Sequence, residues 1–188
     1  MVRAKLLIYD VITVAYVLLV IMALAPWALL SMAPDNHLFL DVSNAIYHFF
    51  SYLCNQLSYR SLYLDGIKMP ICARCISIYT ATILGLVFFR LKGFGAKEFK
   101  INYLLAVLLF LPTGLDGTTQ LFGWRESTNL LRLITGFPYG IGYAYLIVWT
   151  LPFVFLLLEM LQTLVTGGKM EKVEAIALRI KKMVWPLF

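Results

Sequence analysis

The sequence predicts an all-α membrane protein, a polytopic bundle of about four transmembrane helices with an amphipathic helix on each side. Of the 188 residues, 61% are hydrophobic and only 14% are charged, and the mean hydropathy is +0.82. A soluble domain is about half apolar and a quarter charged, so this chain has too few polar groups to cover a water-exposed surface. Its apolar stretches are continuous rather than alternating, which favours membrane helices over a membrane β-barrel.

Four apolar runs reach the roughly 20 residues that a helix needs to cross a bilayer. They are Leu6–Leu30, Ile71–Phe89, Ile101–Leu121 and Tyr139–Val165. The first run is too long for a signal peptide and is followed by no convincing small-residue cleavage site, so we expect it to be retained as a span. The sequence shows neither an internal repeat nor a low-complexity linker, which predicts a single membrane domain over residues 1–188.

Basic residues are unevenly divided between the two sets of connections. One set, which includes both ends of the chain, holds eleven of the sixteen Lys and Arg residues, and the other holds five that are balanced by five acids. Cytoplasmic loops are enriched in Lys and Arg, so we expect the protein in the cell membrane with both termini cytoplasmic. The net charge of +6 favours contact with anionic lipids at the cytoplasmic face. The absence of a basic patch interleaved with aromatics excludes a nucleic-acid partner.

Two connections on the predicted outer side carry helical patterns. Residues 45–66 predict an amphipathic helix whose start is capped by Asp41 or Ser43. We expect this helix to lie on the outer leaflet or to insert partly into it. Residues 125–136 predict a short helix that ends at Gly136 and Pro138.

Two further features concern the ends of the predicted bundle. The small-residue spacing of Gly136 and Gly140 is typical of close helix packing. At the other end of the chain, residues 169–188 predict an amphipathic tail on the cytoplasmic side of the membrane.

Three cysteines fall on the predicted outer side. Cys72 and Cys75 form a CxxC motif in the first turns of the second span, and Cys54 lies 18 residues before Cys72. Residues three apart share a helix face, and the helix N-terminus favours a thiolate. Three cysteines with one nitrogen or oxygen ligand complete a tetrahedral zinc site. We therefore expect Cys54, Cys72 and Cys75 to bind zinc or another transition metal.

Other interpretations of the cysteines remain open at this point. In a membrane thiol–disulfide oxidoreductase, Cys72 would be the nucleophile, Cys75 its partner and Cys54 a shuttle, with a quinone as electron acceptor. Alternatively, the cysteines are small packing residues. Within a metal site, Asp116 is a better fourth ligand on chemical grounds than His48, which lies on a different helix face from Cys54.

Polar residues at the same predicted face extend the candidate site. Asp116 and Gln120 are four apart and Asn129 and Arg132 are three apart, so each pair shares a helix face. Asp116 is expected to pair with Arg132 or Arg125, either in a structural network or in a substrate site. Asp116 and Arg132 are also the candidate catalytic residues, and a transporter or a subunit of a membrane complex is a third possible function. The predicted substrate-binding residues are Gln56, Arg60, Arg74, Asp116, Gln120, Ser127, Asn129 and Arg132.

Two stretches, CNQLSYRSLYLDGIKMPICARCISIY and LDGTTQLFGWRESTNLLRLITGFPYG, resemble the prokaryotic membrane family catalogued as domain of unknown function 2085. The resemblance covers roughly the middle half of the chain. The matching positions are Cys54, Gln56, Arg60, Ser61, Pro70, Cys72, Arg74, Cys75, Tyr79, Asp116, Gly117, Gln120, Ser127, Thr128, Asn129, Arg132, Thr135 and Gly136.

The resemblance implies that the two polar blocks belong together, but it implies no reaction. The family pattern has a histidine after the first cysteine, where this chain has Asn55, so a site of three cysteines and that histidine is not expected. We expect an integral membrane protein with a thiol-rich polar site at its outer face. That site is expected to bind a metal and to act on a polar or lipid-headgroup substrate.

Overall fold

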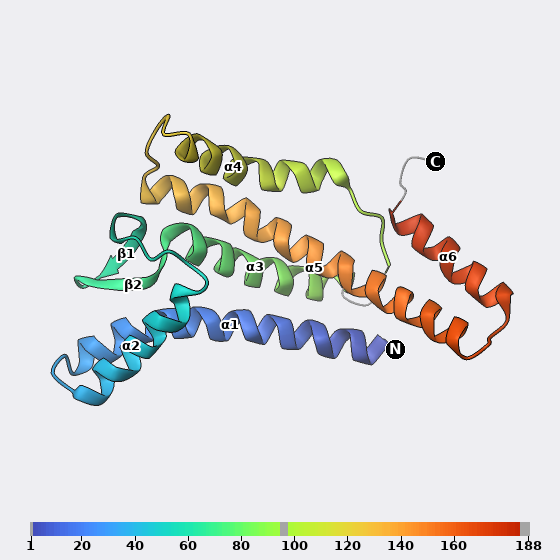
Figure 1. The fold of residues 1–188 in the computed structure, drawn as a ribbon, viewed down its shortest axis with the longest axis horizontal. Coiled ribbons are helices and arrows are strands. Elements are labelled where there is room, and N and C mark those ends of the chain that lie inside the picture. Colours follow the sequence, from blue (N-terminus) through green and yellow to red (C-terminus); the bar gives the residue numbers. More distant parts are fainter. Residues whose placement is uncertain (1, 95–97, 185–188) are drawn as a thin grey trace.

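The computed structural model describes residues 2–94 and 98–184 as a helix bundle with one β-hairpin at one end (Figure 1). The elements in order are α1 (Val2–Met32), α2 (His37–Ser51), a 3₁₀ turn η1 (Ser58–Arg60), β1 (Ser61–Leu64), β2 (Ile67–Cys72), α3 (Ala73–Leu91), α4 (Tyr103–Leu121), α5 (Asn129–Val165) and α6 (Met170–Val184). Among the described residues, four helices are long and apolar enough to cross a membrane, namely α1, α3, α4 and α5. The predicted fold class is confirmed.

The two ends of the bundle differ in what covers them. The hairpin and α2 lie at one end, here called the hairpin end, and α6 lies toward the other, the α6 end (Figure 1). The beginning of α3, the end of α4 and the beginning of α5 all meet at the hairpin end. Segments that are distant in the sequence therefore come together there.

Helices α3 and α5 approach closely because glycines line their contact. A Cβ atom on Gly140 would lie 2.4 Å from the carbonyl oxygen of Ile78, and one on Gly136 would lie 3.0 Å from the carbonyl oxygen of Arg74. The hydroxyl of Thr82 donates to the carbonyl of Gly140 at 3.1 Å. The structure thus confirms the close packing that the small-residue spacing predicted. This contact places the first turns of α3 beside the first turns of α5.

The prediction of a separate short helix over residues 125–136 is wrong. The hydroxyl of Thr128 caps α5 by accepting from the N–H of Leu131 at 3.2 Å, and the helix then continues through Gly136 and Pro138. Gly136 was expected to end a helix, but it packs tightly on α3, and tertiary packing outweighs local propensity. The last predicted span is therefore the second part of one long helix.

The predicted helix over residues 45–66 is correct only in its first part. Helix α2 begins after Asn36, whose side chain accepts from the N–H of Leu38 at 3.0 Å, rather than at Asp41 or Ser43. It ends at Ser51, and the chain then forms the antiparallel pair β1 and β2.

The turn of the hairpin explains why the helix stops early. Asp65 and Gly66 connect the strands with φ angles of 50° and 80°, as a two-residue turn of type I′ requires. An Asp-Gly pair is a strong hairpin signal, and it outweighs the apolar residues at helical spacing around it.

Helix α6 folds back against the end of α5. Ile176 and Met183 are buried against Leu156, and the carbonyl of Met183 accepts from the backbone N–H of Ile101 at 3.3 Å. The structure contains the predicted amphipathic tail helix as Met170–Val184. Residues 185–188 of that tail lie outside the described residues, as does Lys97, one of the eleven basic residues assigned above to the cytoplasmic side.

Candidate functional site

The hairpin brings the three cysteines together. Ser61 on β1 pairs with Cys72 at the end of β2, which holds Cys72 close to the segment that follows α2. The backbone N–H of Cys72 donates to the sulfur of Cys54 at 3.3 Å, and the sulfurs of Cys72 and Cys75 are 3.4 Å apart. All three sulfurs lie within 4.8 Å of one another. The approach of Cys54 to the other pair thus depends on the hairpin.

The surroundings of Cys54 favour its thiolate. The thiols of Cys72 and Cys75 hydrogen-bond to this sulfur, as do backbone N–H groups, and together they lower the pKa of Cys54 below its ordinary value. All three thiols are free and partly buried. Cys72 is also the N-cap residue of α3, where the helix dipole favours negative charge. The cluster therefore offers one sulfur, that of Cys54, in the thiolate form that a metal requires, whereas the hydrogen bond to Cys54 and burial raise the pKa of Cys72.

The sulfur positions match those around a tetrahedral metal ion. With Zn–S bonds of about 2.3 Å, two sulfur ligands lie ~3.8 Å apart. The sulfurs of Cys72 and Cys75 are 3.4 Å apart, close to that value, and all three sulfurs lie within 4.8 Å of one another. Neither Asp116 nor His48 belongs to the cluster of possible ligands found among the described residues. His48 instead lies 3.2 Å from the hydroxyl of Tyr52, and Asp116 is bound within the network described below.

A polar cavity of about 330 Å³ lies beside the sulfurs. It is lined by Ser51, Tyr52, Leu53, Cys54, Asn55, Gln56, Leu57, Arg60, Cys72, Arg74 and Cys75. Because all three cysteines line this cavity, a fourth ligand position can be reached from it. Gln56 has a structural role there: its side-chain amide donates to the backbone carbonyl of Tyr47 at 2.6 Å, and its backbone carbonyl accepts from the Lys68 ammonium at 3.2 Å.

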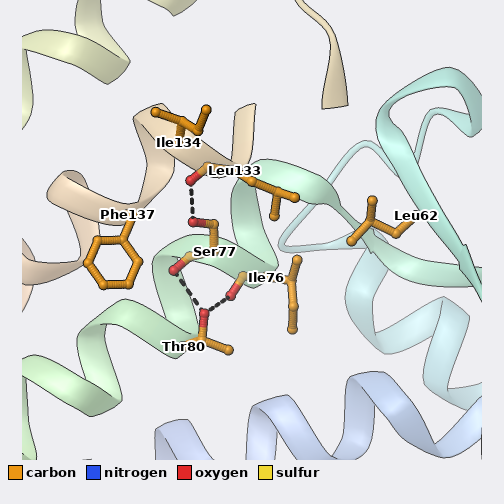
Figure 2. Close-up of a pocket in the computed structure, with 7 residues that line it drawn as sticks. All are labelled: Leu62, Ile76, Ser77, Thr80, Leu133, Ile134 and Phe137. Carbon is orange, nitrogen blue, oxygen red and sulfur yellow. Dashed lines mark hydrogen bonds between the residues drawn. The ribbon is translucent and has the colours of Figure 1, made fainter. Parts of the chain in front are cut away.

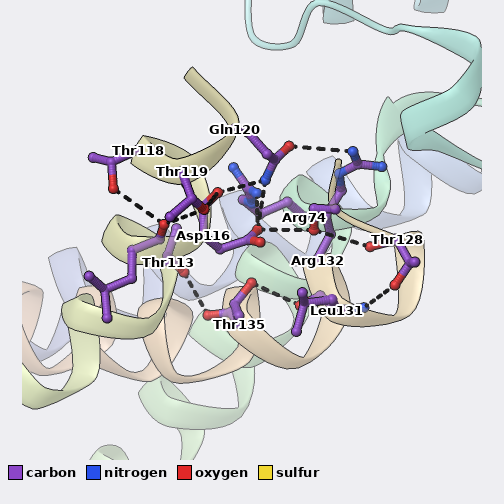
Figure 3. Close-up of polar contacts among 12 residues, drawn as sticks. Arg74, Thr113, Asp116, Thr118, Thr119, Gln120, Thr128, Leu131, Arg132 and Thr135 are labelled. Carbon is purple, nitrogen blue, oxygen red and sulfur yellow. Dashed lines mark hydrogen bonds and ion pairs between the residues drawn. The ribbon is translucent and has the colours of Figure 1, made fainter. Parts of the chain in front are cut away.

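Asp116 on α4 is the centre of a buried ion-pair network (Figure 3). Its carboxylate is 1% exposed and accepts from Arg74, from Arg125 at 2.7 Å, from Gln120 at 3.0 Å and from Ser127 at 3.2 Å. Arg74 lies between Cys72 and Cys75 in the sequence. The network therefore connects the cysteine cluster to the end of α4.

Arg132 does not pair with Asp116, and the prediction that either Arg125 or Arg132 would do so is correct only for Arg125. Arg132 is 3% exposed and donates to the side chain of Asn129 at 2.8 Å. It also donates at 3.4 Å to the side chain of Gln120 (Figure 3). A further bond, also of 3.4 Å, goes to the backbone carbonyl of Tyr59. Gln120 lies between the buried arginine and Asp116, because it bonds to both.

The two polar blocks that the resemblance implied to belong together are in contact. The amide of Asn129 on α5 donates to the carbonyl of Ser61 on β1 at 3.2 Å, and Arg132 contacts Tyr59 just before that strand. Arg74 joins the first block to Asp116 in the second. The hairpin, α3, α4 and α5 thus share one polar region.

A second polar cavity of about 330 Å³ lies against this network. It is lined by Tyr59, Arg60, Gln120, Gly123, Arg125, Glu126 and Arg132. Arg60 lines both polar cavities, so it lies between the cysteines and the other arginines. Asp116, the candidate catalytic acid, lines neither cavity.

Several lining residues were not among the predicted site residues, and the sequence offered few signals for them. Arg125 was considered only as an ion-pair partner, although it is a lone basic residue next to the polar block. Tyr59 takes part through its backbone carbonyl, which any residue type carries. Asn55 lines the cysteine cavity at the position where the family pattern has histidine.

A further open groove is apolar and has no cluster of polar groups (Figure 2). It measures about 620 Å³ and is lined by Leu62, Ile76, Ser77, Thr80, Leu133, Ile134 and Phe137. The hydroxyl of Ser77 donates to the carbonyl of Leu133 at 2.6 Å, and that of Thr80 donates to the carbonyl of Ile76 at 2.8 Å. Because both hydroxyls are bound to backbone, they are not directed at a ligand. The polar cavities are the better candidate site.

Comparison with known proteins finds relatives for the part of the chain that forms this site. Residues 54–146 match the family described as "Predicted membrane protein (DUF2085)". An uncharacterised protein of Methanocaldococcus jannaschii is 39% identical over 107 residues, which are 56% of this chain and 68% of the relative. An uncharacterised protein of Methanothermobacter thermautotrophicus is 43% identical over 99 residues, 52% of this chain and 86% of the relative. No solved structure matches the chain.

Proposed function

The chain belongs to the DUF2085 family of membrane proteins, and we propose that it holds a transition-metal ion, in the first instance zinc, on Cys54, Cys72 and Cys75. The observation that carries the proposal is the meeting of three sulfurs within 4.8 Å from segments separated by a hairpin. Cysteines that only fill space have no need to gather around one point. A metal held there would tie the segment after α2 to the start of α3.

A bound ion would have one ligand position facing the polar cavity. Sites with three protein ligands and one open position are typical of catalytic zinc, which acts as a Lewis acid, whereas structural zinc has four protein ligands. Arg60 and Arg74 line the same cavity as the sulfurs and could orient a negatively charged group there. We propose a polar molecule or a lipid headgroup as the substrate class.

We place this site at the extracytoplasmic face of the cell membrane, with the α6 end in the cytoplasm. The uneven distribution of Lys and Arg supports that orientation, because it assigns the basic connections at the α6 end to the inside. Helix α6 is basic on its exposed side and lies at that end, which fits contact with anionic lipid headgroups.

The test is elemental analysis of the detergent-purified chain, with free thiols counted on the same sample after denaturation. We expect about one equivalent of metal in the wild type and none in a Cys72→Ser/Cys75→Ser variant. Ser51→Ala is the matched control, because Ser51 lines the same cavity but offers no sulfur. Absence of metal together with three free thiols would overturn the proposal.

A second function, thiol–disulfide exchange, is favoured by the 3.4 Å separation of the Cys72 and Cys75 sulfurs. In that reaction the two thiols would give two electrons and two protons to a quinone, forming one disulfide and a quinol. The same measurement separates the two functions. A metal-free protein with two thiols missing until a reductant is added would support exchange instead of metal binding.

A further inference from the structure

The second polar cavity carries more positive charge than its surroundings neutralise. Arg60, Arg125 and Arg132 line it, and Glu126 is the one acid in its lining. Among the described residues, the salt bridges give neither Arg60 nor Arg132 a carboxylate partner. Arg125 shares the single carboxylate of Asp116 with Arg74, so that carboxylate is fully used.

Burial makes this imbalance significant. Arg132 is 3% exposed, and its hydrogen bonds all go to uncharged oxygens of Asn129, Tyr59 and Gln120. An unneutralised charge away from water costs free energy, so buried arginines normally have an anion beside them. The acceptors that hydrogen-bond to Arg132 are amide and carbonyl oxygens only.

The arginines also have unused donors. In the part of the chain that the structure describes, the Nε atoms of Arg60 and Arg132 are buried and have no hydrogen-bond partner. A guanidinium group presents its donors in a planar fork that matches the oxygens of a phosphate or carboxylate group. Two such forks at one cavity call for a ligand with several acceptor oxygens.

We infer that the cavity between Arg60, Arg125 and Arg132 binds an oxyanion of the phosphate class, either free or as the headgroup of an anionic lipid. The cavity of about 330 Å³ has room for a phosphate group with some water, since one water occupies ~30 Å³. Arg60 lines both cavities, so the bound anion would lie next to the cysteines. This inference goes beyond the proposed metal site and does not depend on it.

The test is calorimetric titration of the detergent-purified full chain with inorganic phosphate, and separately with dihexanoylphosphatidic acid, in a chloride buffer. We expect saturable binding of at least one ligand, and a loss of affinity of about tenfold or more in Arg60→Gln, because a hydrogen bond to a charged group is lost. Binding of free phosphate identifies a small-anion site. Binding of the lipid alone identifies a headgroup site.

Two further variants keep this test decisive. Lys172→Gln removes one positive charge from exposed α6 and should leave the affinity for inorganic phosphate unchanged. Arg60→Lys keeps the charge but loses the planar fork, so its affinity should fall between those of wild type and Arg60→Gln, and it replaces Arg60→Gln if that variant fails to fold. If neither ligand binds, or if both Arg60 variants bind like wild type, the inference is overturned.

The same titration after chelator treatment separates this inference from the proposed function. Binding that persists without metal, and that Arg60→Gln weakens, supports the arginine site even if the cysteines hold no metal. Binding that disappears with the metal and is insensitive to Arg60 would place the anion on the metal instead, and would overturn the arginine site.

Discussion

Among the described residues, ion pairs form at both ends of the bundle, but only the pairs at the hairpin end contain a buried carboxylate. Asp116 is 1% exposed and is shared by Arg74 and Arg125. At the α6 end, Arg179 and Glu98 also form an ion pair, yet their side chains are 47% and 24% exposed. An exposed pair contributes little to stability, whereas a buried charge must be fully satisfied by its neighbours.

The difference shows which end of the molecule is specialised. A buried charge network is expensive to assemble, and a packed apolar contact would hold the same helices together as well or better. Helices α5 and α6 are held together by such an apolar contact, because they pack mainly through apolar residues around Leu156. The hairpin end thus has the features of a binding site, and the α6 end has those of a structural contact.

The sharpest way to test this contrast is to remove the buried carboxylate. Asp116→Asn should lower the free energy of unfolding by about 3 kcal/mol, because it leaves two arginines without an anion in a largely buried region. We choose the low end of the usual range since Arg74 and Arg125 are 22% and 42% exposed. The measurement is denaturant titration in mixed micelles. Asp116→Asn/Arg125→Gln should recover part of the loss, and a double variant as unstable as the sum of its parts would contradict the network.

A smaller effect is expected at the turn of the hairpin. Gly66 has a φ of 80° with open space around it, so Gly66→Ala should cost about 1 kcal/mol through backbone strain alone. Gly167, with a φ of 66°, offers the same change at the α6 end.

The two glycine variants should differ in metal content rather than in stability. Both should lose about 1 kcal/mol, but only Gly66→Ala should weaken metal retention, because β2 positions Cys72. Metal content is measured by elemental analysis after dialysis. Equal retention in both variants would show that the hairpin does not hold the cysteines together.

The smallest effect is expected for the exposed ion pair. Glu98→Gln should change the free energy of unfolding by about 0.5 kcal/mol, since solvent screens its interaction with Arg179. The difference from wild type should vanish at about 1 M salt, where charges are screened within ~3 Å. The same denaturant titration at low and high salt measures it, and a loss close to that of Asp116→Asn would remove the contrast between the two ends.

Much of the architecture could be predicted from the sequence because it depends on local spacing. The four spans follow from runs of apolar residues, and the gathering of polar residues at one end follows from counting how often the chain crosses the membrane. Contacts within one helix were also predictable. Asn129 with Arg132 and Asp116 with Gln120 are hydrogen-bonded as their spacing of three and four residues requires.

Errors arose where two local signals competed. The apolar residues after Ala45 have helical spacing, and they concealed the Asp65-Gly66 pair that turns the chain into a hairpin. Gly136 and Pro138 are helix-ending residues in isolation, but α5 continues through them because α3 packs against its glycine face. In both places a neighbouring element decided between two conformations that the sequence allowed.

The sequence by itself determined the membrane class, the number of spans and the residue types gathered at one end, because these follow from composition and helical period. Only the tertiary structure decided that Cys54 reaches Cys72, that Arg74 pairs with Asp116, and that Arg132 is left without an anion. The first two contacts join positions 18 and 42 residues apart. Their geometry depends on the hairpin turn and on how closely α3 and α5 pack, and no periodic pattern along the chain records either one.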